Sequence, residues 1–474
     1  MRHITVRDIL RVTEGTLRIM GQPDGADDDD LSDKELKDLC IDSREVKPGD
    51  LFIPLIGERV DAHRFIPEVM GTVTASLTDR EPAKIYSGSE QVKEAEERKD
   101  ILIKVADTQK ALERIGAYIR TQYEPPVVGV TGSVGKTTTR RMIATALGSC
   151  REVYETPGNL NSHIGIPLAT SRMLDAPSEI AVLEMGIDRI GEMDVEYAIV
   201  RPEIAVVTMI GVSHMEYLGS REGIRREKLK IAGQDTTLFL NADDPLLTGL
   251  RGKTQAREVL YYGFSESADY RAEEVEIGER GHCFTYVNGD TRIRVELPVL
   301  GKHNVRNALV AMAICDYLGM DLQKAAAGLA GFQGLRQIIR HMPQGTILID
   351  DTYNASPESM RAALSVLTEL EVKDSKWAVL GDMFELGSES ETFHREVGRS
   401  ITDYRIDHLV TVGGSALFLG EEAEKKDPSL SHLHFNNIEE AGAYLKKQLQ
   451  PGDAILLKAS HGMNFAKIVD ELMA

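Results

Sequence analysis

The residues best suited to chemistry lie in one segment, GVTGSVGKTTTRRMIATAL, at positions 129–147. An apolar strand leads there into a glycine-containing turn, followed by a lysine, a threonine and an amphipathic helix. Such a turn can direct successive backbone N–H groups at an anion, and the helix N-terminus adds partial positive charge. The lysine can reach terminal phosphates, and the threonine hydroxyl can ligate Mg²⁺. The segment therefore predicts a nucleotide site formed by Gly132, Ser133, Val134, Gly135, Lys136, Thr137 and Thr138.

The glycine spacing differs from the strict GxxxxGK[ST] pattern. That pattern requires glycine at the position of Val130, whereas the glycines stand at 129 and 132. A chance glycine-rich turn before a helix is the alternative interpretation. Because the strand, the turn, the Lys-Thr pair and the helix all agree, the segment favours phosphate binding.

Two further polar residues follow predicted strands, where ligands of α/β sheets bind. Glu184 lies near the end of the run IAVLEMG, which is too apolar to tolerate a carboxylate without a partner. We expect it to ligate Mg²⁺, and a buried salt bridge is the alternative. His214 follows the next strand, and this position supports a ligand role as well as a structural one.

Three residues on predicted helices have two interpretations each. Lys228 lies in REGIRREKLKIAG, where the local pattern indicates a solvated basic face. Asn304 and Asn307 are three residues apart on one helical face, so both can point at one ligand. Asn304 could instead cap the N-terminus of its helix.

The elements around these residues predict three α/β domains. Residues 1–107 mix short apolar runs, such as the strand-like 51–56, with turns. Residues 108–338 begin with a helix at 108–121 and then alternate strands, glycine-rich loops and helices, which predicts a P-loop domain with a mostly parallel sheet. Residues 339–474 repeat this alternation and predict a Rossmann-like, doubly wound domain.

Composition excludes several classes of function. The chain has 474 residues, a formal net charge of −20 and 42% hydrophobic residues. Its acidic surface repels polyanions, so we expect no nucleic-acid partner. No apolar run is long enough to span a membrane and no signal core is present, so we expect a cytoplasmic protein that is not membrane-bound. The four cysteines form no CxxC pair, and the acidic run Asp27–Asp30 favours a solvated loop over a metal site.

Taken in order, the motifs resemble those of the Mur ligase family. The segments that carry the resemblance are TGSVGKTTT, LEMG, SHMEYLGSREGIRREK, LNADD and GKHNVRNAL. More selective similarity lies in DSREVKPGDLFIPLIGERVDAH, TPGNLNSHIGIP, LIDDTYNASPESM, VLGDMFELG and ILLKAS. The resemblance runs from Asp42 to Leu472. It implies an ATP-dependent ligase that forms an amide bond through an acyl phosphate.

The resemblance also implies substrates and residue roles. The substrates would be a UDP-N-acetylmuramoyl-tripeptide, bound by the N-terminal domain, and D-alanyl-D-alanine, bound by the C-terminal domain of a monomer. Two Mg²⁺ ions would be held by Thr137, Glu184, His214 and Lys228, the last at a position often carbamylated by CO₂. The adenosine of ATP would contact Asn304, Asn307, Arg336 and Asp351. Other substrate contacts would come from Asp42, Ser43, Arg44, Asn159, Asn161, Tyr353, Asn354, Lys458 and Ser460.

Several positions depart from the family pattern. Ser162-His163 replaces Asn-Asn or Asn-Asp, Ala62 and Lys230 replace Gly and Glu, Leu335 precedes Arg336, and His461 stands where Arg is frequent. A related ligase with another acceptor or amine substrate therefore stays an alternative. A regulatory nucleotide-binding protein would be expected to have lost Glu184, His214 or Lys228. A simple hydrolase or kinase would need no second doubly wound domain.

The phosphate-binding turn leads to a direct prediction. We expect Lys136→Ala to lower turnover by orders of magnitude, because the lysine neutralises charge on the transferred phosphoryl group, and to leave the fold intact. Steady-state phosphate release and circular dichroism measure the two effects. Activity at the wild-type level would remove the nucleotide assignment from this turn.

Overall fold

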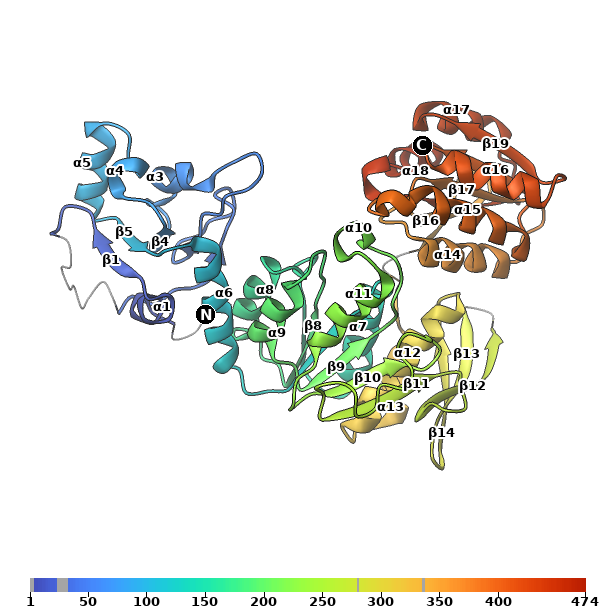
Figure 1. Ribbon diagram of the computed structural model, residues 1–474, viewed down its shortest axis with the longest axis horizontal. Coiled ribbons are helices and arrows are strands. Elements are labelled where there is room, and N and C mark those ends of the chain that lie inside the picture. Colours follow the sequence, from blue (N-terminus) through green and yellow to red (C-terminus); the bar gives the residue numbers. More distant parts are fainter. Residues whose placement is uncertain (1–3, 24–32, 279–280, 335–336) are drawn as a thin grey trace. The chain divides into compact units, whose positions relative to one another are not determined.

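The computed structural model describes residues 4–23, 33–278, 281–334 and 337–474 (Figure 1). The chain divides into two compact units. The first unit comprises Met1–Gly129, Glu152–Ile187 and Gly191–Ile204, and the second Val130–Arg151, Asp188–Ile190 and Ala205–Ala474. Three sheets of five, nine and six strands organise these units. The α/β architecture with three sheets and mostly parallel strand pairs confirms the fold class predicted from the sequence. In the described part of the chain, no helix has the length and apolar character needed to cross a membrane.

The five-stranded sheet belongs to the N-terminal part of the first unit. Its order is β1 (Thr16–Ile19), β5 (Ile101–Lys104), β4 (Ala75–Thr78), β3 (Leu51–Phe52), β2 (Leu39–Cys40), with β1 antiparallel to its neighbour. The helices are α1 (Val6–Thr13), α3 (Ile66–Val69), α4 (Pro82–Ile85), α5 (Ser89–Arg98) and α6 (Thr108–Thr121). The predicted strand 51–56 is too long: β3 ends at Phe52, and Pro54 has no N–H with which to continue a ladder.

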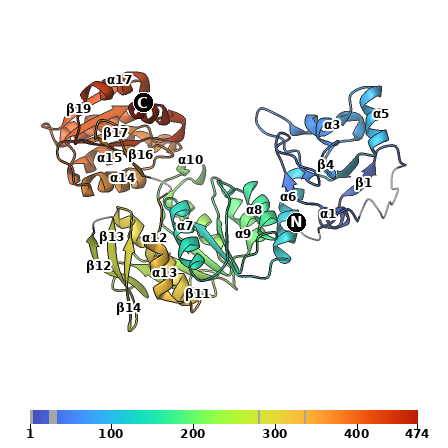
Figure 2. The same cartoon turned by 180° about the vertical axis from the view of Figure 1, so that it is seen from behind.

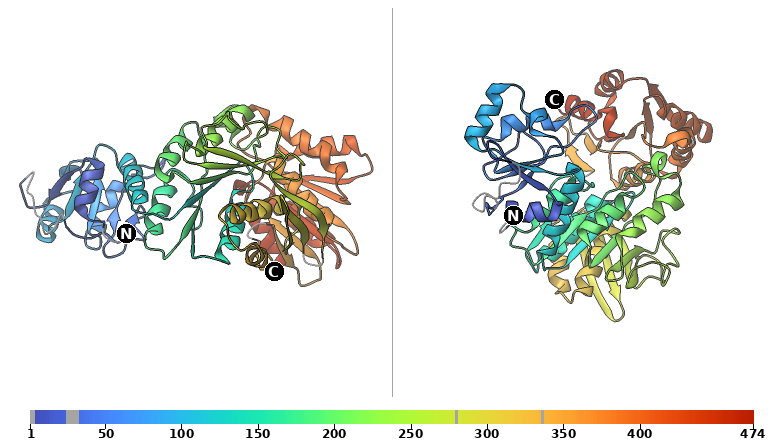
Figure 3. Two further views of the ribbon diagram at one scale, coloured as in Figure 1. Left: turned by 90° about the horizontal axis from the view of Figure 1, so that it is seen from below. Right: turned by 60° about the vertical axis from the view of Figure 1, so that its left-hand side comes forward.

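Nine strands form the central sheet. Their order is β14 (Thr291–Leu297), β13 (His282–Asn288), β12 (Tyr270–Ile277), β11 (Glu258–Gly263), β10 (Thr237–Asn241), β9 (Ile204–Val207), β6 (Val127–Thr131), β8 (Ile180–Glu184), β7 (Val153–Glu155). The antiparallel end, β12 to β14, was not predicted; its hairpin is yellow in Figure 3. The helices are α7 (Lys136–Gly148), α8 (Gly165–Met173), α9 (Glu192–Val200), α10 (Met215–Leu218), α11 (Arg221–Lys228), α12 (Lys302–Tyr317) and α13 (Leu322–Leu329).

The C-terminal sheet is covered by helices on both faces (Figure 2). Its order is β15 (Ile338–His341), β16 (Ile347–Asp351), β20 (Ala454–Lys458), β17 (Lys376–Gly381), β18 (His408–Val412), β19 (Ser431–Phe435), and all pairs except β15–β16 are parallel. Side chains of β16, β17, β18 and β20 alternate between two apolar cores. One core contains α14 (Pro357–Glu369), α15 (Ser390–Ser400) and α16 (Ala416–Lys426), and the other α17 (Ile438–Gln448) and α18 (Ala466–Met473).

Helices α15 and α16 meet at Gly398. A Cβ atom at this position would lie 2.3 Å from the carbonyl oxygen of Leu419, so the two backbones touch because the side chain is absent. We expect Gly398→Ala to lower the free energy of unfolding by about 1–3 kcal/mol, because overpacking outweighs the gain in helix propensity. Denaturant titration followed by fluorescence measures this, since the single tryptophan, Trp377, lies buried in β17 of the same domain.

The matched control is Gly414→Ala. A Cβ atom at Gly414 would meet nothing within 4 Å. Equal unfolding midpoints for both variants would contradict the proposed helix contact.

Candidate active site

The predicted phosphate turn joins β6 to α7 and is fixed by the two residues that follow strand β9, Thr208 and Met209. A Cβ atom at Gly132, where φ is +149°, would lie 1.8 Å from Oγ1 of Thr208, so only glycine fits. The hydroxyl of Thr208 donates to the carbonyl of Val134 at 2.6 Å. The N–H of Ser133 donates to the carbonyl of Met209 at 2.9 Å. These contacts hold the turn in one conformation ahead of the helix.

The turn presents donors to an anion. Lys136 begins α7, and its ammonium group donates to the carbonyl of Gly132 at 3.0 Å, so the charge lies across the turn. The first backbone N–H groups of any helix have no carbonyl partner within that helix. Within the described residues, the buried hydroxyl oxygens of Ser133 and Thr139 have no hydrogen-bond partner. Buried polar atoms of this kind need a partner, and phosphate oxygens are suited to that role.

Asn307 of α12 lies beside the same turn, and Asn304 is bonded to Asn307. The Oδ1 atom of Asn307 lies 3.5 Å from the position of a Cβ atom at Gly135. Asn307 also donates to Oδ1 of Asn304 at 3.4 Å, and both are buried. Gly301 is the N-cap of the helix, so the capping alternative for Asn304 is wrong. The amide of Asn307 therefore lies next to the turn, and that of Asn304 is one hydrogen bond farther away.

His214 lies between two carboxylates. Its Nδ1 is 2.7 Å from Oε2 of Glu385, and its Nε2 is 3.3 Å from Oδ1 of Asp188. The hydrogen bond with His214 lowers the pKa of the Glu385 carboxyl. His214 has a left-handed backbone, with φ of 60°, and Val212 just before it is buried in the apolar core of the C-terminal domain. The imidazole is therefore oriented by both its backbone and its carboxylate neighbours.

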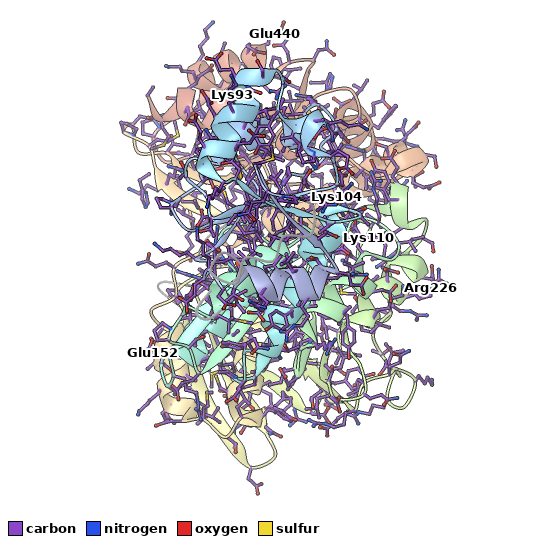
Figure 4. All side chains as sticks on the ribbon, turned by 90° about the vertical axis from the view of Figure 1, so that its left-hand side faces the viewer. Lys93, Lys104, Lys110, Glu152, Arg226 and Glu440 are labelled. Carbon is purple, nitrogen blue, oxygen red and sulfur yellow. The ribbon has the colours of Figure 1, made fainter. Side chains whose placement is uncertain are left out.

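Lys228 is fully buried at the end of α11. The local prediction of a solvated basic face is wrong at this residue, although it holds for Arg226, which points outward from the same helix (Figure 4). The segment contains five basic residues, and only Lys228 among them is buried. The spacing of these residues along the helix does not reveal which one faces the interior. A buried ammonium group is costly, so this position requires compensating chemistry.

Glu184 is the last residue of β8 and is buried. The side chain of Asn161 donates to its Oε1 at 2.8 Å, and the backbone N–H of Glu184 donates to Oγ1 of Thr156. The N–H of Gly186 donates to the carbonyl of Asn161 at 2.7 Å. Asn161 therefore orients the carboxylate, whereas Asn159, two residues earlier, is exposed.

The residues predicted to contact the UDP moiety lie just after β2 in the chain. Arg44 donates to both carboxylate oxygens of Asp42, at 2.9 and 2.5 Å, and these bonds lower the pKa of Asp42 to about 2. Arg44 is exposed and Ser43 is half-buried. Sequence reasoning missed a second cluster in this domain, where buried His63 lies 2.8 Å from Asp61 and 3.1 Å from Asp79.

In the C-terminal domain, two of the residues predicted to contact substrate, Lys458 and Ser460, are buried and hydrogen-bonded within the protein. Lys458 is 1% exposed and donates to Oδ2 of Asp351 and to the carbonyl of Asn354, both at 2.8 Å. Ser460 is buried and accepts the N–H of Phe384 at 2.9 Å. Tyr353, by contrast, is 45% exposed and can contact a ligand.

Some predicted residues are not placed. Arg336, Leu335 and the acidic run Asp27–Asp30 lie outside the described residues. Across the residues that are described, no group of three or more His, Cys, Asp or Glu side chains has an arrangement that could hold a metal ion. Thr208, Asp188, Glu385 and Phe384 were missed by sequence reasoning. Glu385 and Phe384 lie in the quoted segment VLGDMFELG, which is the signal that could have found them.

Three family models match the chain. They are the Mur ligase family catalytic domain at residues 35–120, the Mur ligase middle domain at 130–315 and the Mur ligase glutamate ligase domain at 336–461. A curated relative from Bacillus subtilis, UDP-N-acetylmuramoyl-tripeptide–D-alanyl-D-alanine ligase, is 37% identical and covers 99% of this chain and 98% of its own length. The chain belongs to the Mur ligase family.

Other Mur ligases support this placement. The Escherichia coli protein with the same enzyme name is 33% identical over 81% of this chain and 82% of its own. The crystal structure of MurF from Acinetobacter baumannii superposes with a TM-score of 0.85, at 30% identity, covering 99% and 98% of the two chains. MurF from Thermotoga maritima, solved with ADP, gives a TM-score of 0.78 at 26% identity, over 94% and 98% of the chains. These structures bear out the predicted three-domain fold.

The buried pair of Lys458 and Asp351 predicts a stability effect. Lys458→Met leaves the carboxylate of Asp351 buried without its cation, which typically costs about 3–5 kcal/mol. We expect a loss of that order in the unfolding free energy measured through Trp377 fluorescence. The double variant Lys458→Met/Asp351→Leu removes both charges and should recover most of the loss. Equal stabilities of the single and double variants would show that the pair is not coupled.

Proposed function

We propose that this chain joins D-alanyl-D-alanine to the terminal carboxylate of a UDP-N-acetylmuramoyl-tripeptide, converting ATP to ADP and phosphate, in peptidoglycan precursor synthesis. The observation that carries the proposal is full-length similarity to the Bacillus subtilis ligase, at 37% identity. The phosphate turn ahead of Lys136 supplies the physical basis for the use of ATP.

The chemistry follows from the leaving group. A carboxylate is a poor acyl donor because oxide would have to leave. An oxygen of the tripeptide carboxylate therefore attacks the γ-phosphorus of ATP, and ADP departs, which leaves an acyl phosphate. The amine nitrogen of the dipeptide attacks the acyl carbon and forms a tetrahedral oxyanion, which expels phosphate as the amine loses its proton. Lys136 and the N–H groups at the start of α7 stabilise charge on the transferred phosphoryl group.

Some of the residues proposed to bind Mg²⁺ are typical ligands of this ion, and one is less usual. Thr137 and Glu184 offer the oxygen ligands that Mg²⁺ prefers, and protein sites commonly complete its shell with substrate phosphates. His214 is a less usual ligand for this ion, but the carboxylate of Asp188 lies 3.3 Å from its Nε2 and adds an oxygen donor. We propose that these residues and a carbamylated Lys228 hold two Mg²⁺ ions, which would neutralise phosphate charge.

The remaining roles follow from the same proposal. Asn304, Asn307, Arg336 and Asp351 contact the adenosine, and Asp42, Ser43 and Arg44 contact the UDP moiety. The proposed domains are residues 1–107, 108–338 and 339–474, in a cytoplasmic monomer. Closure of such domains around ATP would exclude water, which otherwise hydrolyses the acyl phosphate.

A coupled assay tests the function. Purified protein is given ATP, Mg²⁺, D-alanyl-D-alanine and UDP-N-acetylmuramoyl-tripeptide containing either meso-diaminopimelate or lysine, and phosphate release is measured. We expect release to depend on both the dipeptide and a tripeptide. Release with single amino acids but not with the dipeptide would instead favour a ligase with another amine substrate.

Burial of Lys228 predicts chemical rescue. We expect Lys228→Ala to be inactive, because it removes the carbamate and leaves a void in a buried site. Added short carboxylates such as acetate should restore part of the activity by supplying the missing anion. Arg226→Ala on the exposed face of the same helix is the control and should keep its activity. Full activity of Lys228→Ala without any additive would refute the carbamate role.

A further inference from the structure

A histidine that the proposed mechanism does not use is buried inside the C-terminal domain. His394 lies in α15 and is fully buried. Its Nδ1 is 2.7 Å from the carbonyl oxygen of Ser390, and its Nε2 is 3.0 Å from the backbone nitrogen of Met383. A carbonyl can only accept a hydrogen bond, and a backbone N–H can only donate one. The imidazole is therefore neutral, with its proton on Nδ1 and a bare Nε2 that accepts the N–H of Met383.

Met383 belongs to a loop that needs support from its surroundings. The loop comprises residues 382–387 and follows β17, and we call it the 382–387 loop. Glu385 in this loop has a φ of 62°, a left-handed conformation that is uncommon outside glycine. Such a conformation persists only where surrounding contacts hold it. His394 supplies one of these contacts, from a helix that lies outside the loop.

The 382–387 loop contacts the segment that carries His214. Oε2 of Glu385 is 2.7 Å from Nδ1 of His214, and the carbonyl of Glu385 accepts the N–H of Glu216 at 3.4 Å. A Cβ atom at Gly387 would lie 3.5 Å from Cα of Glu216, so the two backbones pack together. The position of the loop therefore determines which groups surround the imidazole of His214.

We propose that His394 is a positioning residue, which holds the 382–387 loop beside His214 while its ring is neutral and releases the loop when Nε2 takes up a proton. A proton on Nε2 places an N–H against the N–H of Met383, and neither group can accept. The ring stays fixed by its bond to Ser390, so the loop is the part that moves. The consequence for catalysis rests on the proposed function, because it requires His214 to be in the active site.

Burial controls the protonation of the ring. It lowers the pKa of His394, and the bond to Ser390 and the negative charge of Asp382 offset part of this effect. Glu389 and Asp403, which flank α15 in the chain, are exposed. Charged side chains of α15 also pair with those of neighbouring helices, Arg395 and Arg399 with Glu422 of α16, and Glu396 with Arg361 of α14.

The lowered pKa fixes the direction of the effect. The ordinary pKa of histidine is about 6.5. As the pH falls below that value, a released ring binds a proton while the buried ring stays neutral, until the pH reaches the lowered pKa. The held loop therefore has its full stability above about pH 6.5 and loses it progressively in acid. At pH 5.0 the protonated form of a free imidazole exceeds the neutral form roughly thirtyfold, which sets the upper scale of the effect.

Hydrogen exchange of the free protein tests the release. Exchange of the 382–387 loop is followed by mass spectrometry at pH 7.5 and pH 5.0, and each rate is divided by the intrinsic rate of the unfolded segment. His394→Gln places an amide oxygen near the position of Nε2, so it accepts the N–H of Met383 but does not titrate. In wild type we expect the protection of that N–H to fall roughly 10- to 30-fold at pH 5.0. In His394→Gln the protection should stay nearly constant.

Steady-state kinetics test the positioning role, with ATP, D-alanyl-D-alanine and the UDP-N-acetylmuramoyl-tripeptide as substrates. His394→Leu leaves the N–H of Met383 buried without an acceptor, so we expect kcat at pH 7.5 to fall roughly 5- to 100-fold. KM for the UDP substrate should not change, because the N-terminal domain is proposed to bind it. His394→Gln should recover most of kcat. His341→Gln replaces an exposed histidine of β15 in the same domain and should change neither kcat nor exchange.

The outcomes distinguish this proposal from the proposed function. Equal loss of protection in wild type and His394→Gln at pH 5.0 overturns the release, and so does constant protection in wild type. Wild-type kcat in a folded His394→Leu variant overturns the positioning role. If that variant does not fold, the exchange of His394→Gln still decides. If wild type shows no dipeptide-dependent phosphate release, the proposed function fails, whereas the exchange experiment still tests the loop.

Discussion

The close approach of Thr208, which directly follows strand β9, to the phosphate turn is the constraint on which the site depends. A methyl group at Gly132 would overlap Oγ1 of Thr208, so the backbone can lie there only without a side chain. Thr208 then holds the carbonyl of Val134, and the neighbouring Met209 holds the N–H of Ser133. The carbonyls and N–H groups of the turn are oriented by these contacts before any nucleotide arrives. Such preorganisation lets fixed dipoles stabilise charge without a reorganisation cost.

In the C-terminal domain, buried polar side chains also fix loops through hydrogen bonds. A buried lysine, Lys458, bonds to Asp351 and to the backbone of the following loop. The buried hydroxyl of Ser460 fixes the loop after β17. These contacts fix the loops that follow β16 and β17, which carry the exposed side chains of Tyr353 and Phe384.

The structural features that the sequence predicts well are formed by residues close together in the chain. The phosphate turn is a contiguous strand, turn and helix, and helix α6 has the bounds predicted from its apolar spacing. Glu184 was identified because one carboxylate interrupts an apolar strand. Lys228 could not be recognised locally, since burial of one lysine among five basic residues depends on what packs against the helix. Only similarity to the Mur ligases singled it out.

Residues that act across the fold escaped prediction. Thr208 supports a turn more than 70 positions earlier, and Glu385 meets His214 from another sheet. The antiparallel strands β12 to β14 were missed because strand direction is set by pairing partners and not by composition. The bond from Asn161 to Glu184 was likewise not predicted, and the predicted contact of Asn161 with substrate stays a prediction.

The central claim is that the turn ahead of Lys136 binds ATP so that its terminal phosphoryl group passes to a carboxylate. Isotope transfer tests this most directly. UDP-N-acetylmuramoyl-tripeptide carrying ¹⁸O in its terminal carboxylate is converted with ATP and D-alanyl-D-alanine, and the released phosphate is analysed by mass spectrometry. The account predicts one ¹⁸O atom in each phosphate released from fully labelled substrate. Unlabelled phosphate, released while amide product accumulates, would contradict it.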